Sequence, residues 1–306
     1  MPTASQPVAF RGAYTAIVTP FSRDGKTIDL ERLRQQVKLQ ADGGVTGIVV
    51  AGTTGESPTL SDQEYRTLVT KAVDIGHALG LQVIVGTGSN STHHAVEQHT
   101  FARSAGADGS LSVNPYYNKP VQEGLFRHFM AVAESSDLPV MLYNVPGRSG
   151  VALTPDTVAR LAEHPNIRAI KEATGSVDSA SEIAMRCPGL ALLSGDDSMT
   201  LPFGSVGAVG VVSVVSNVLP RRVTELCKAI LSENWTEALV IHRELFPICR
   251  AMFIETNPIP VKYALNHVGV TVGGLRLPMI EASADARARI DAELAKHSLD
   301  VLAVRV

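Results

Sequence analysis

The sequence predicts an α/β protein, a (β/α)8 TIM barrel with a small C-terminal helical lobe. Three observations lead to this prediction. Eight short runs rich in apolar and β-branched residues recur between residues 14 and 214 of the 306-residue chain. Longer segments with helical spacing of apolar residues separate these runs. After residue 219 the strand-like runs stop, and the remaining segments all have helical patterns.

The predicted strands are apolar at nearly every position, which is typical of parallel strands that helices cover on both faces. An open doubly wound sheet and a closed barrel would both give this alternation. We favour the barrel, because residues 18–21 (Val-Thr-Pro-Phe) follow the first strand where an open nucleotide-binding sheet would carry GxGxxG. The predicted strands are 14–19, 47–50, 83–86, 109–113, 140–144, 167–171, 191–194 and 210–214.

The predicted helices begin at recognisable capping residues. Ser61 is followed three residues later by Glu64, and Thr154 is followed directly by Pro155. We expect one barrel over residues 1–232, carrying the active site, and a C-terminal helical extension over residues 233–306. The clearest amphipathic segments are 30–41, 62–79, 92–104 and 154–163, and the C-terminal ones are 221–228, 235–253, 259–268 and 284–294.

The composition is that of an ordinary globular protein, with 45% hydrophobic residues, 19% charged residues and a net charge of −3. There is no run of Lys or Arg, so we expect no nucleic-acid partner, and the apolar runs are too short to span a membrane. The first seven residues have no secretory pattern and are expected to form a frayed tail of a cytoplasmic protein. The cysteines, which are odd in number and widely spaced, are expected to be reduced and buried. They are Cys187, Cys227 and Cys249.

Polar residues gather where the predicted strands end. In a barrel these ends meet at one mouth, which is where barrel enzymes place their active sites. The sharpest candidate is Lys171, because alternation along 167–171 turns it into the barrel interior. A buried lysine is either a nucleophile for a carbonyl group or a structural ion-pair partner, here of Glu172, and position alone does not separate the two. The other polar strand ends are 52–57, 114–118, 143–148 and 194–197.

Several neighbouring groups suit a small anionic substrate, although each also has an ordinary structural explanation. Residues 53–56 form a turn of small residues before a helix, whose hydroxyl and N–H groups fit a carboxylate or simply cap the helix. Arg148 could grip a carboxylate or lie solvated on a loop. Near Lys171, phenols could relay protons, or pack as core aromatic residues. These phenols are Tyr116, Tyr117 and Tyr143.

The sequence does not support a metal site. His93 and His94 are adjacent on a helix and therefore diverge, and Asp196 and Asp197 have no third ligand at a suitable spacing. A Ser–His–Asp hydrolase is not supported either, because the chain has no GxSxG elbow.

Six motifs in order along the chain resemble the dihydrodipicolinate synthase/N-acetylneuraminate lyase family of class I aldolase-like barrels. The resemblance covers essentially the whole chain. It implies a lyase that needs no metal or organic cofactor, works as a homotetramer and binds pyruvate as a Schiff base. The matching segments are 52–57 (GTTGES), 114–120 (NPYYNKP), 143–148 (YNVPGR), 170–175 (IKEATG), 194–197 (SGDD) and 257–262 (NPIPVK).

The resemblance also implies a role for each site residue. Lys171 would form the Schiff base, and Tyr143 would be the general acid and base beside it. Thr53 and Tyr117 would complete a proton relay, with Tyr117 entering from a neighbouring subunit. The resemblance further implies that Thr54 binds the pyruvate carboxylate and that two main-chain segments line the pyruvate pocket. These segments lie at Gly195 and Val212.

Arg148 distinguishes subgroups within the resemblance. Members that condense pyruvate with L-aspartate 4-semialdehyde, in lysine and diaminopimelate biosynthesis, have Tyr-Asn-Val-Pro-x-Arg at residues 143–148, as this chain does. We expect that reaction. The alternatives are a related pyruvate-dependent aldolase or dehydratase acting on a sugar acid or other 2-keto acid, and a non-catalytic keto-acid-binding protein.

One position departs from the family pattern. Members that lysine inhibits bind it at a subunit interface that includes a glutamate, and His94 stands at that position here. Asp62 and Tyr65 lie on the preceding helix, whereas Asn90 and Tyr116 keep the family pattern. Because a cationic ligand would lack its glutamate, we expect weak or absent feedback by lysine.

Overall fold

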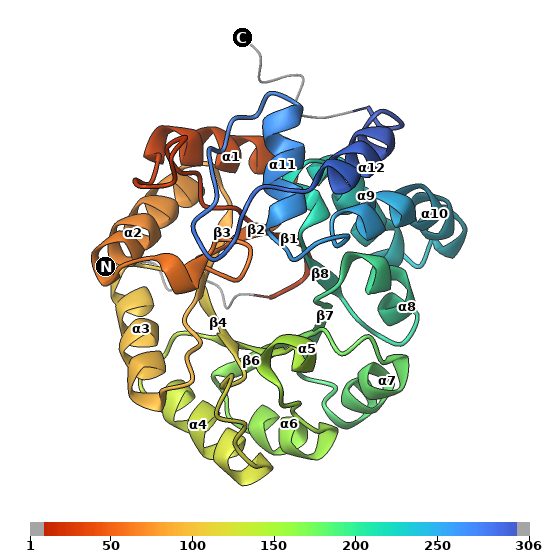
Figure 1. The fold of residues 1–306 in the computed structure, drawn as a ribbon. Helices are drawn as coiled ribbons and strands as arrows, with labels where there is room; N and C mark the ends of the chain where they lie inside the picture. Colours follow the sequence, from red (N-terminus) through yellow and green to blue (C-terminus); the bar gives the residue numbers. More distant parts are fainter. Residues whose placement is uncertain (1–8, 299–306) are drawn as a thin grey trace.

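A computed structural model describes residues 9–298 of the chain. Its eight strands are all parallel and form a closed barrel in chain order, with β8 pairing back onto β1 (Figure 1). The predicted fold class is thereby confirmed, whereas the expected frayed tail at residues 1–7 lies outside the described residues. The strands are β1 (Gly12–Ala16), β2 (Gly47–Val50), β3 (Gln82–Gly86), β4 (Gly109–Val113), β5 (Val140–Asn144), β6 (Ile167–Glu172), β7 (Ala191–Ser194) and β8 (Gly210–Ser213).

Helices surround the barrel on the outside (Figure 1). Several start as predicted: Ser61 and Glu64 form a reciprocal capping box, and the Thr154 side chain caps the helix that begins at Pro155. The helices are α1 (Leu30–Asp42), α2 (Asp62–Ala78), α3 (Thr92–Ser104), α4 (Gln122–Glu134), α5 (Pro146–Ser149), α6 (Pro155–Ala162), α7 (Val177–Arg186), α8 (Thr200–Gly204), α9 (Pro220–Leu231), α10 (Trp235–Ala251), α11 (Ile259–His267) and α12 (Ala284–Leu294), with 3-10 turns η1 (Ser57–Thr59), η2 (Asp197–Met199) and η3 (Val215–Asn217).

The prediction for the first strand was shifted by two to three residues. We expected 14–19, whereas β1 runs from Gly12 to Ala16. The strand begins early because the N–H of Gly12 donates to the carbonyl of Val209. It ends early because the N–H of Val18 donates to the side chain of Asn217 rather than to a strand.

The strands are buried on both faces, as their apolar sequences predict. One cluster of side chains fills the barrel interior and includes Tyr14, Ile84, Met141, Leu193 and Val212. Larger clusters lie between the strands and the surrounding helices. The three cysteines are free and buried, as expected. No helix within residues 9–298 is long and apolar enough to cross a membrane.

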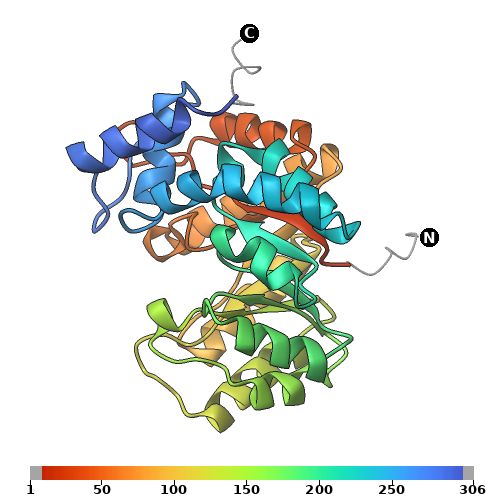
Figure 2. The ribbon, with the colours of Figure 1, turned by 90° about the vertical axis from the view of Figure 1, so that its right-hand side faces the viewer.

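The C-terminal helices form a lobe on one side of the barrel, next to α1 and α9 (Figures 1 and 2). Apolar residues of α10 and α11, such as Ile248 and Val261, belong to the same buried cluster as Val37 of α1 and Ile48 of β2. The lobe therefore packs on the barrel through a continuous apolar core.

Candidate active site

Lys171 and Tyr143 form the centre of the site, at the carboxyl ends of β6 and β5. The two residues are register partners on neighbouring strands, so the pairing of the strands sets their spacing. The Lys171 Nζ atom lies 4.2 Å from the centre of the Tyr143 ring. Each residue is only 6% exposed. The structure thus places an amine and a phenol together at the position where barrel enzymes carry out their chemistry.

The ion-pair explanation for Lys171 is wrong. Glu172 is the next residue on β6, and its carboxylate accepts hydrogen bonds from Asn144 Nδ2 at 3.0 Å and from the N–H of Thr174 at 2.7 Å. Burial raises the pKa of this carboxyl group. No ion pair involves Lys171 within residues 9–298. A buried lysine without an anionic partner is suited to covalent chemistry with a carbonyl group.

Gly195 leaves room for the Lys171 side chain. A β-carbon built on Gly195 would lie 3.0 Å from Lys171 Cε and 2.7 Å from the β-carbon of Ala173, closer than ordinary contacts allow. Val212 on β8 is buried in the interior cluster that also contains Tyr143. Gly195 therefore lies against Lys171, and Val212 belongs to the apolar interior of the barrel.

The turn after β2, residues 52–57, carries Thr53 and Thr54 and is called the threonine turn below. The N–H groups of Gly55, Glu56 and Ser57 bond to carbonyl groups within the turn. Among the described residues, the N–H groups of Thr53 and Thr54 have no such partner. Backbone N–H groups that are free in this way can bind an anion.

A buried ion pair holds this turn from the C-terminal lobe. Lys262 of α11 donates to Glu56 at 2.6 Å, and the two side chains are only 1% and 2% exposed. Lys262 also donates to the carbonyl of Gly274 at 2.8 Å, and the N–H of Arg276 donates to Glu56 at 3.0 Å. Burial lowers the pKa of Lys262, while the charge of Glu56 opposes this change. Since a buried charge is costly without its partner, the pair fixes the turn to the lobe.

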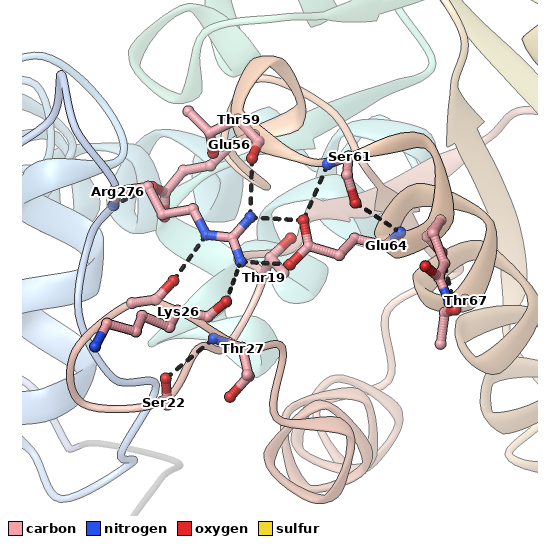
Figure 3. A network of polar contacts seen from close by, with 12 residues as sticks. Thr19, Ser22, Lys26, Thr27, Glu56, Thr59, Ser61, Glu64, Thr67 and Arg276 are labelled. Atoms are coloured by element: carbon pink, nitrogen blue, oxygen red, sulfur yellow. Dashed lines mark hydrogen bonds and ion pairs between the residues drawn. The ribbon is translucent and has the colours of Figure 1, made fainter.

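Arg276 extends this attachment to α2 (Figure 3). Its guanidinium group donates to both carboxylate oxygens of Glu64, in one case at 2.9 Å, and to the carbonyl of Thr59 at 2.8 Å. This contact lowers the pKa of Glu64 to about 2. The threonine turn and the start of α2 are therefore both held by residues more than 200 positions later in the chain.

Arg148 lies on α5, directly after β5. Its Nη2 atom donates to the backbone carbonyl of Asn257 at 3.4 Å, and the side chain borders a cavity of about 420 Å³. Thr53 and Tyr143 line the same cavity, whereas Lys171 does not line it directly but packs against Tyr143. The cavity is also lined by residues such as Asp62, Tyr65, Ser89, His94 and Tyr116.

Tyr117 is not brought into the site of this chain. Tyr117 is 89% exposed, and its backbone φ is +75°, a value that residues other than glycine rarely adopt. The expected site residues that this single chain does gather around the mouth come from several elements. They are Thr53, Thr54, Tyr143, Arg148, Lys171 and Gly195.

The Dihydrodipicolinate synthetase family model matches residues 9–297. The chain belongs to this family. A 4-hydroxy-tetrahydrodipicolinate synthase of Methanothrix thermoacetophila is 49% identical over 291 residues, which cover 94% of this chain and 97% of the relative. The enzyme of the same name from Methanocaldococcus jannaschii is 48% identical over 275 residues, covering 90% and 94% of the two chains.

Solved structures of dihydrodipicolinate synthases share the fold. The Aquifex aeolicus structure matches with a TM-score of 0.91 at 43% identity, covering 94% of this chain and 98% of that one. The Cyanidioschyzon merolae structure, which has lysine bound, matches with a TM-score of 0.92 at 39% identity, covering 94% and 98%. The resemblance that the six motifs predicted is thereby confirmed.

The aspartate pair of the family's Ser-Gly-Asp-Asp segment supports the backbone. Asp197 is buried, accepts a hydrogen bond from the Ser213 hydroxyl and binds the N–H groups of Val214 at 2.8 Å and Val215 at 3.2 Å. Asp196 accepts from the N–H of Ser198 at 3.1 Å. Both carboxylates are occupied by their own chain. Within residues 9–298, no three His, Cys, Asp or Glu residues are grouped to hold a metal ion.

Three residues that shape the site were not predicted to have a role. Asn144 receives the N–H of Leu153 at 3.0 Å and donates to its carbonyl at 3.1 Å, which folds the segment after α5 against β5. Asn257 and Lys262 reach the threonine turn from beyond α10. The only signal in the sequence was their presence in the motifs 143–148 (Asn144) and 257–262 (Asn257 and Lys262), which indicate no partner.

Proposed function

We propose that this protein is a 4-hydroxy-tetrahydrodipicolinate synthase, a lyase that condenses pyruvate with L-aspartate 4-semialdehyde through a Schiff base. The observation that carries the proposal is the buried Lys171 amine, which has no carboxylate partner within residues 9–298 and packs 4.2 Å from the Tyr143 ring. The family relatives named as this synthase support the choice of reaction.

In the proposed mechanism, Lys171 attacks the ketone carbon of pyruvate as a free amine. A carbon–nitrogen bond forms and water leaves, giving the protonated imine. Loss of a proton from the methyl group gives an enamine, whose carbon attacks the aldehyde of the second substrate. The amino group of that substrate then attacks the imine carbon, which closes the ring and releases Lys171. Tyr143 is proposed as the acid and base for the proton transfers.

The proposed binding groups match the charges of the substrates. Thr54, with its unoccupied N–H group, binds the carboxylate of pyruvate, and the segments at Gly195 and Val212 line the keto-acid pocket. Arg148 binds the carboxylate of the semialdehyde with its planar fork. Binding both carboxylates brings the enamine and the aldehyde together, which supplies much of the rate advantage of a two-substrate enzyme.

We further propose a homotetramer in the cytoplasm. Tyr117 and Val121 are 89% and 76% exposed on one loop, and a neighbouring subunit would cover them. In that assembly Tyr117 completes the relay with Thr53 and Tyr143 of its neighbour. Buried free thiols agree with a reducing compartment. Residues 1–232 are proposed as the catalytic barrel, and residues 233–306 as a helical extension of it. Light scattering after size-exclusion chromatography tests the assembly, and a monomer with full activity would contradict it.

The test of function combines turnover with trapping. Wild-type protein, Lys171→Ala and Lys228→Ala are assayed for condensation of pyruvate with L-aspartate 4-semialdehyde. In parallel, borohydride reduction with pyruvate is followed by mass spectrometry of peptides. Lys228 is an exposed residue of α9 and serves as the matched control. We expect turnover and a reduced adduct on Lys171 in the wild type and in Lys228→Ala, and neither in Lys171→Ala.

The same experiment separates the alternatives. An adduct on Lys171 without condensation would keep the Schiff-base class and replace the second substrate, and a panel of sugar acids and 2-keto acids would then identify it. Absence of any adduct in the wild type would overturn the Schiff-base mechanism itself.

A further inference from the structure

We propose that Asn257 is a positioning residue that orients the two carboxylate-binding groups, Thr54 and Arg148, relative to each other. The inference rests on the proposed function and goes beyond it, because it assigns a role in substrate binding to a residue outside the strand ends of the barrel. Asn257 lies between α10 and α11, in the C-terminal lobe.

Asn257 contacts both groups at once. Its side-chain Nδ2 atom donates to the Thr54 hydroxyl at 2.9 Å, and its backbone carbonyl accepts from Arg148 Nη2 at 3.4 Å. Asn257 and Thr54 are buried, with 4% and 3% exposure, so water does not compete for the bond between them. The Asn257 Oδ1 atom has no hydrogen-bond partner among the described residues, so the bond to Thr54 sets the orientation of the amide.

The direction of this hydrogen bond matters for binding an anion. A hydroxyl group has one hydrogen to donate and can accept through its lone pairs. Because the Thr54 oxygen accepts from Asn257, its own hydrogen remains free to donate. A hydroxyl that donates attracts a carboxylate, whereas one that presents only lone pairs repels it. Asn257 thus turns Thr54 into a donor for the carboxylate of pyruvate.

Hydrogen bonds of the neighbouring residues fix the segment that carries Asn257. The N–H of Lys262 donates to the carbonyl of Pro258 at 3.0 Å in the first turn of α11, and the Lys262 amine forms the buried pair with Glu56. Glu56 lies two residues after Thr54. The lobe therefore contacts the threonine turn at two points, and the Asn257 contact is the one that also reaches Arg148.

The test compares Asn257→Ala and Asn257→Asp with Asn266→Ala. Asn266 is a matched control, because it is also an asparagine of the lobe whose side chain binds two groups, the N–H of Val272 and the carbonyl of Gly273. It is exposed on α11 and is not among the residues that line the cavity. Wild-type turnover and trapping of pyruvate on Lys171 are measured first, since their absence would refute the proposed function and not the role of Asn257. KM for each substrate, kcat and thermal unfolding are then measured for every variant.

We expect Asn257→Ala to raise KM for pyruvate about fivefold to tenfold, as the loss of one oriented hydrogen bond predicts. KM for the semialdehyde should rise less, because the backbone carbonyl that binds Arg148 remains. Asn257→Asp should be worse than alanine for pyruvate. Its carboxylate accepts the Thr54 hydrogen and repels the incoming anion. Asn266→Ala should lower thermal stability without changing either KM.

A double-mutant cycle with Thr54→Val completes the test. If Asn257 acts through the Thr54 hydroxyl, adding Asn257→Ala to Thr54→Val should change KM for pyruvate by less than about twofold. Additive effects in the cycle would overturn the proposal. An aspartate variant that binds pyruvate as well as the alanine variant would also overturn it, and so would equal KM changes in Asn257→Ala and Asn266→Ala.

Discussion

The two sides of the barrel mouth are built in different ways. On one side, called the strand side, the pairing of β5 with β6 holds Lys171 and Tyr143, and the strand register sets their spacing. On the other side, called the loop side, Thr53 and Thr54 lie on a turn that depends on contacts from Asn257 and Lys262. The proposed nucleophile therefore belongs to the rigid barrel, whereas the turn proposed to bind a carboxylate depends on attachment to the C-terminal lobe. Substitutions on the strand side should therefore act first on turnover, and substitutions on the loop side should act first on the free energy of unfolding.

The largest effect is expected on the strand side. Tyr143→Phe removes only the phenol oxygen proposed to transfer protons. It should lower kcat/KM by about 10²–10⁴-fold while leaving thermal stability nearly unchanged. Steady-state kinetics and thermal unfolding measure the two quantities. Tyr263→Phe is the matched control, because its hydroxyl bonds to Asp291 within the lobe and should not affect turnover. A Tyr143→Phe enzyme with more than a tenth of wild-type activity would argue against the assigned role.

On the loop side, Lys262→Met should act first on stability. The change leaves the Glu56 carboxylate buried without its partner, which typically costs about 3–5 kcal/mol. Chemical denaturation measures the free energy of unfolding, with the exposed Lys228→Met as the control. Adding Glu56→Gln to Lys262→Met should recover part of the loss. If the double variant is no more stable than the single one, the buried charge is not the cause.

Gly195→Ala probes the strand side by crowding. The added methyl group would meet Lys171 Cε at 3.0 Å, so it should displace the amine and slow trapping of pyruvate. Overpacking of this kind costs about 1–3 kcal/mol. Gly189→Ala is the matched control, since a methyl group added there would have no atom within 4 Å. Unchanged trapping by Gly195→Ala would show that Lys171 tolerates the contact.

Glu64 gives the loop side a dependence on pH. Its pKa is about 2 in the folded protein, against an ordinary value of 4.5, because it binds Arg276. The stabilisation is therefore complete above pH 4.5 and is lost as the pH falls from 4.5 toward 2. The stability difference between wild type and Glu64→Gln, about 1–2 kcal/mol at pH 7, should shrink below pH 4.5. A difference that stays constant down to pH 3 would contradict this assignment.

The smallest effect is expected for added lysine. His94 lines the cavity at the position where we expect inhibited members to have a glutamate, so lysine should inhibit turnover weakly or not at all. His94→Glu should strengthen any inhibition. Inhibition of the wild type by micromolar lysine in a steady-state assay would contradict the prediction.

The strand side of the site could be predicted because a strand has a local pattern of alternating residues in the sequence. Alternation along residues 167–171 predicted that Lys171 faces inward. The end of the preceding strand made Tyr143 one of several candidate phenols, and the family resemblance gave it a role. The loop side was not predictable in the same way. The partners Glu56 and Lys262 are 206 residues apart, and no periodicity connects them. Arg148 was predicted as a candidate, but its contact with Asn257 depends on how the lobe folds back.

The position of Tyr117 was difficult to predict for a different reason. Its place in the motif at residues 114–120 singled it out, yet its side chain is exposed and does not enter the site of its own chain. A residue proposed to act in a neighbouring subunit cannot be placed from one chain's strand order, because the groups proposed to surround it belong to another subunit.

The hydrogen bonds from Lys262 and Arg276 to Glu56 of the threonine turn have a consequence for folding during synthesis. Synthesis proceeds from the N-terminus, and N-terminal parts generally fold first. Lys171 can take its place while the chain is still growing, but the turn at residues 52–57 stays unanchored until residue 276 has emerged from the ribosome. A nascent chain should then hold Lys171 in place before the turn proposed to bind the pyruvate carboxylate is anchored. Such an order would delay the proposed chemistry of the Lys171 amine until the C-terminal lobe has been made.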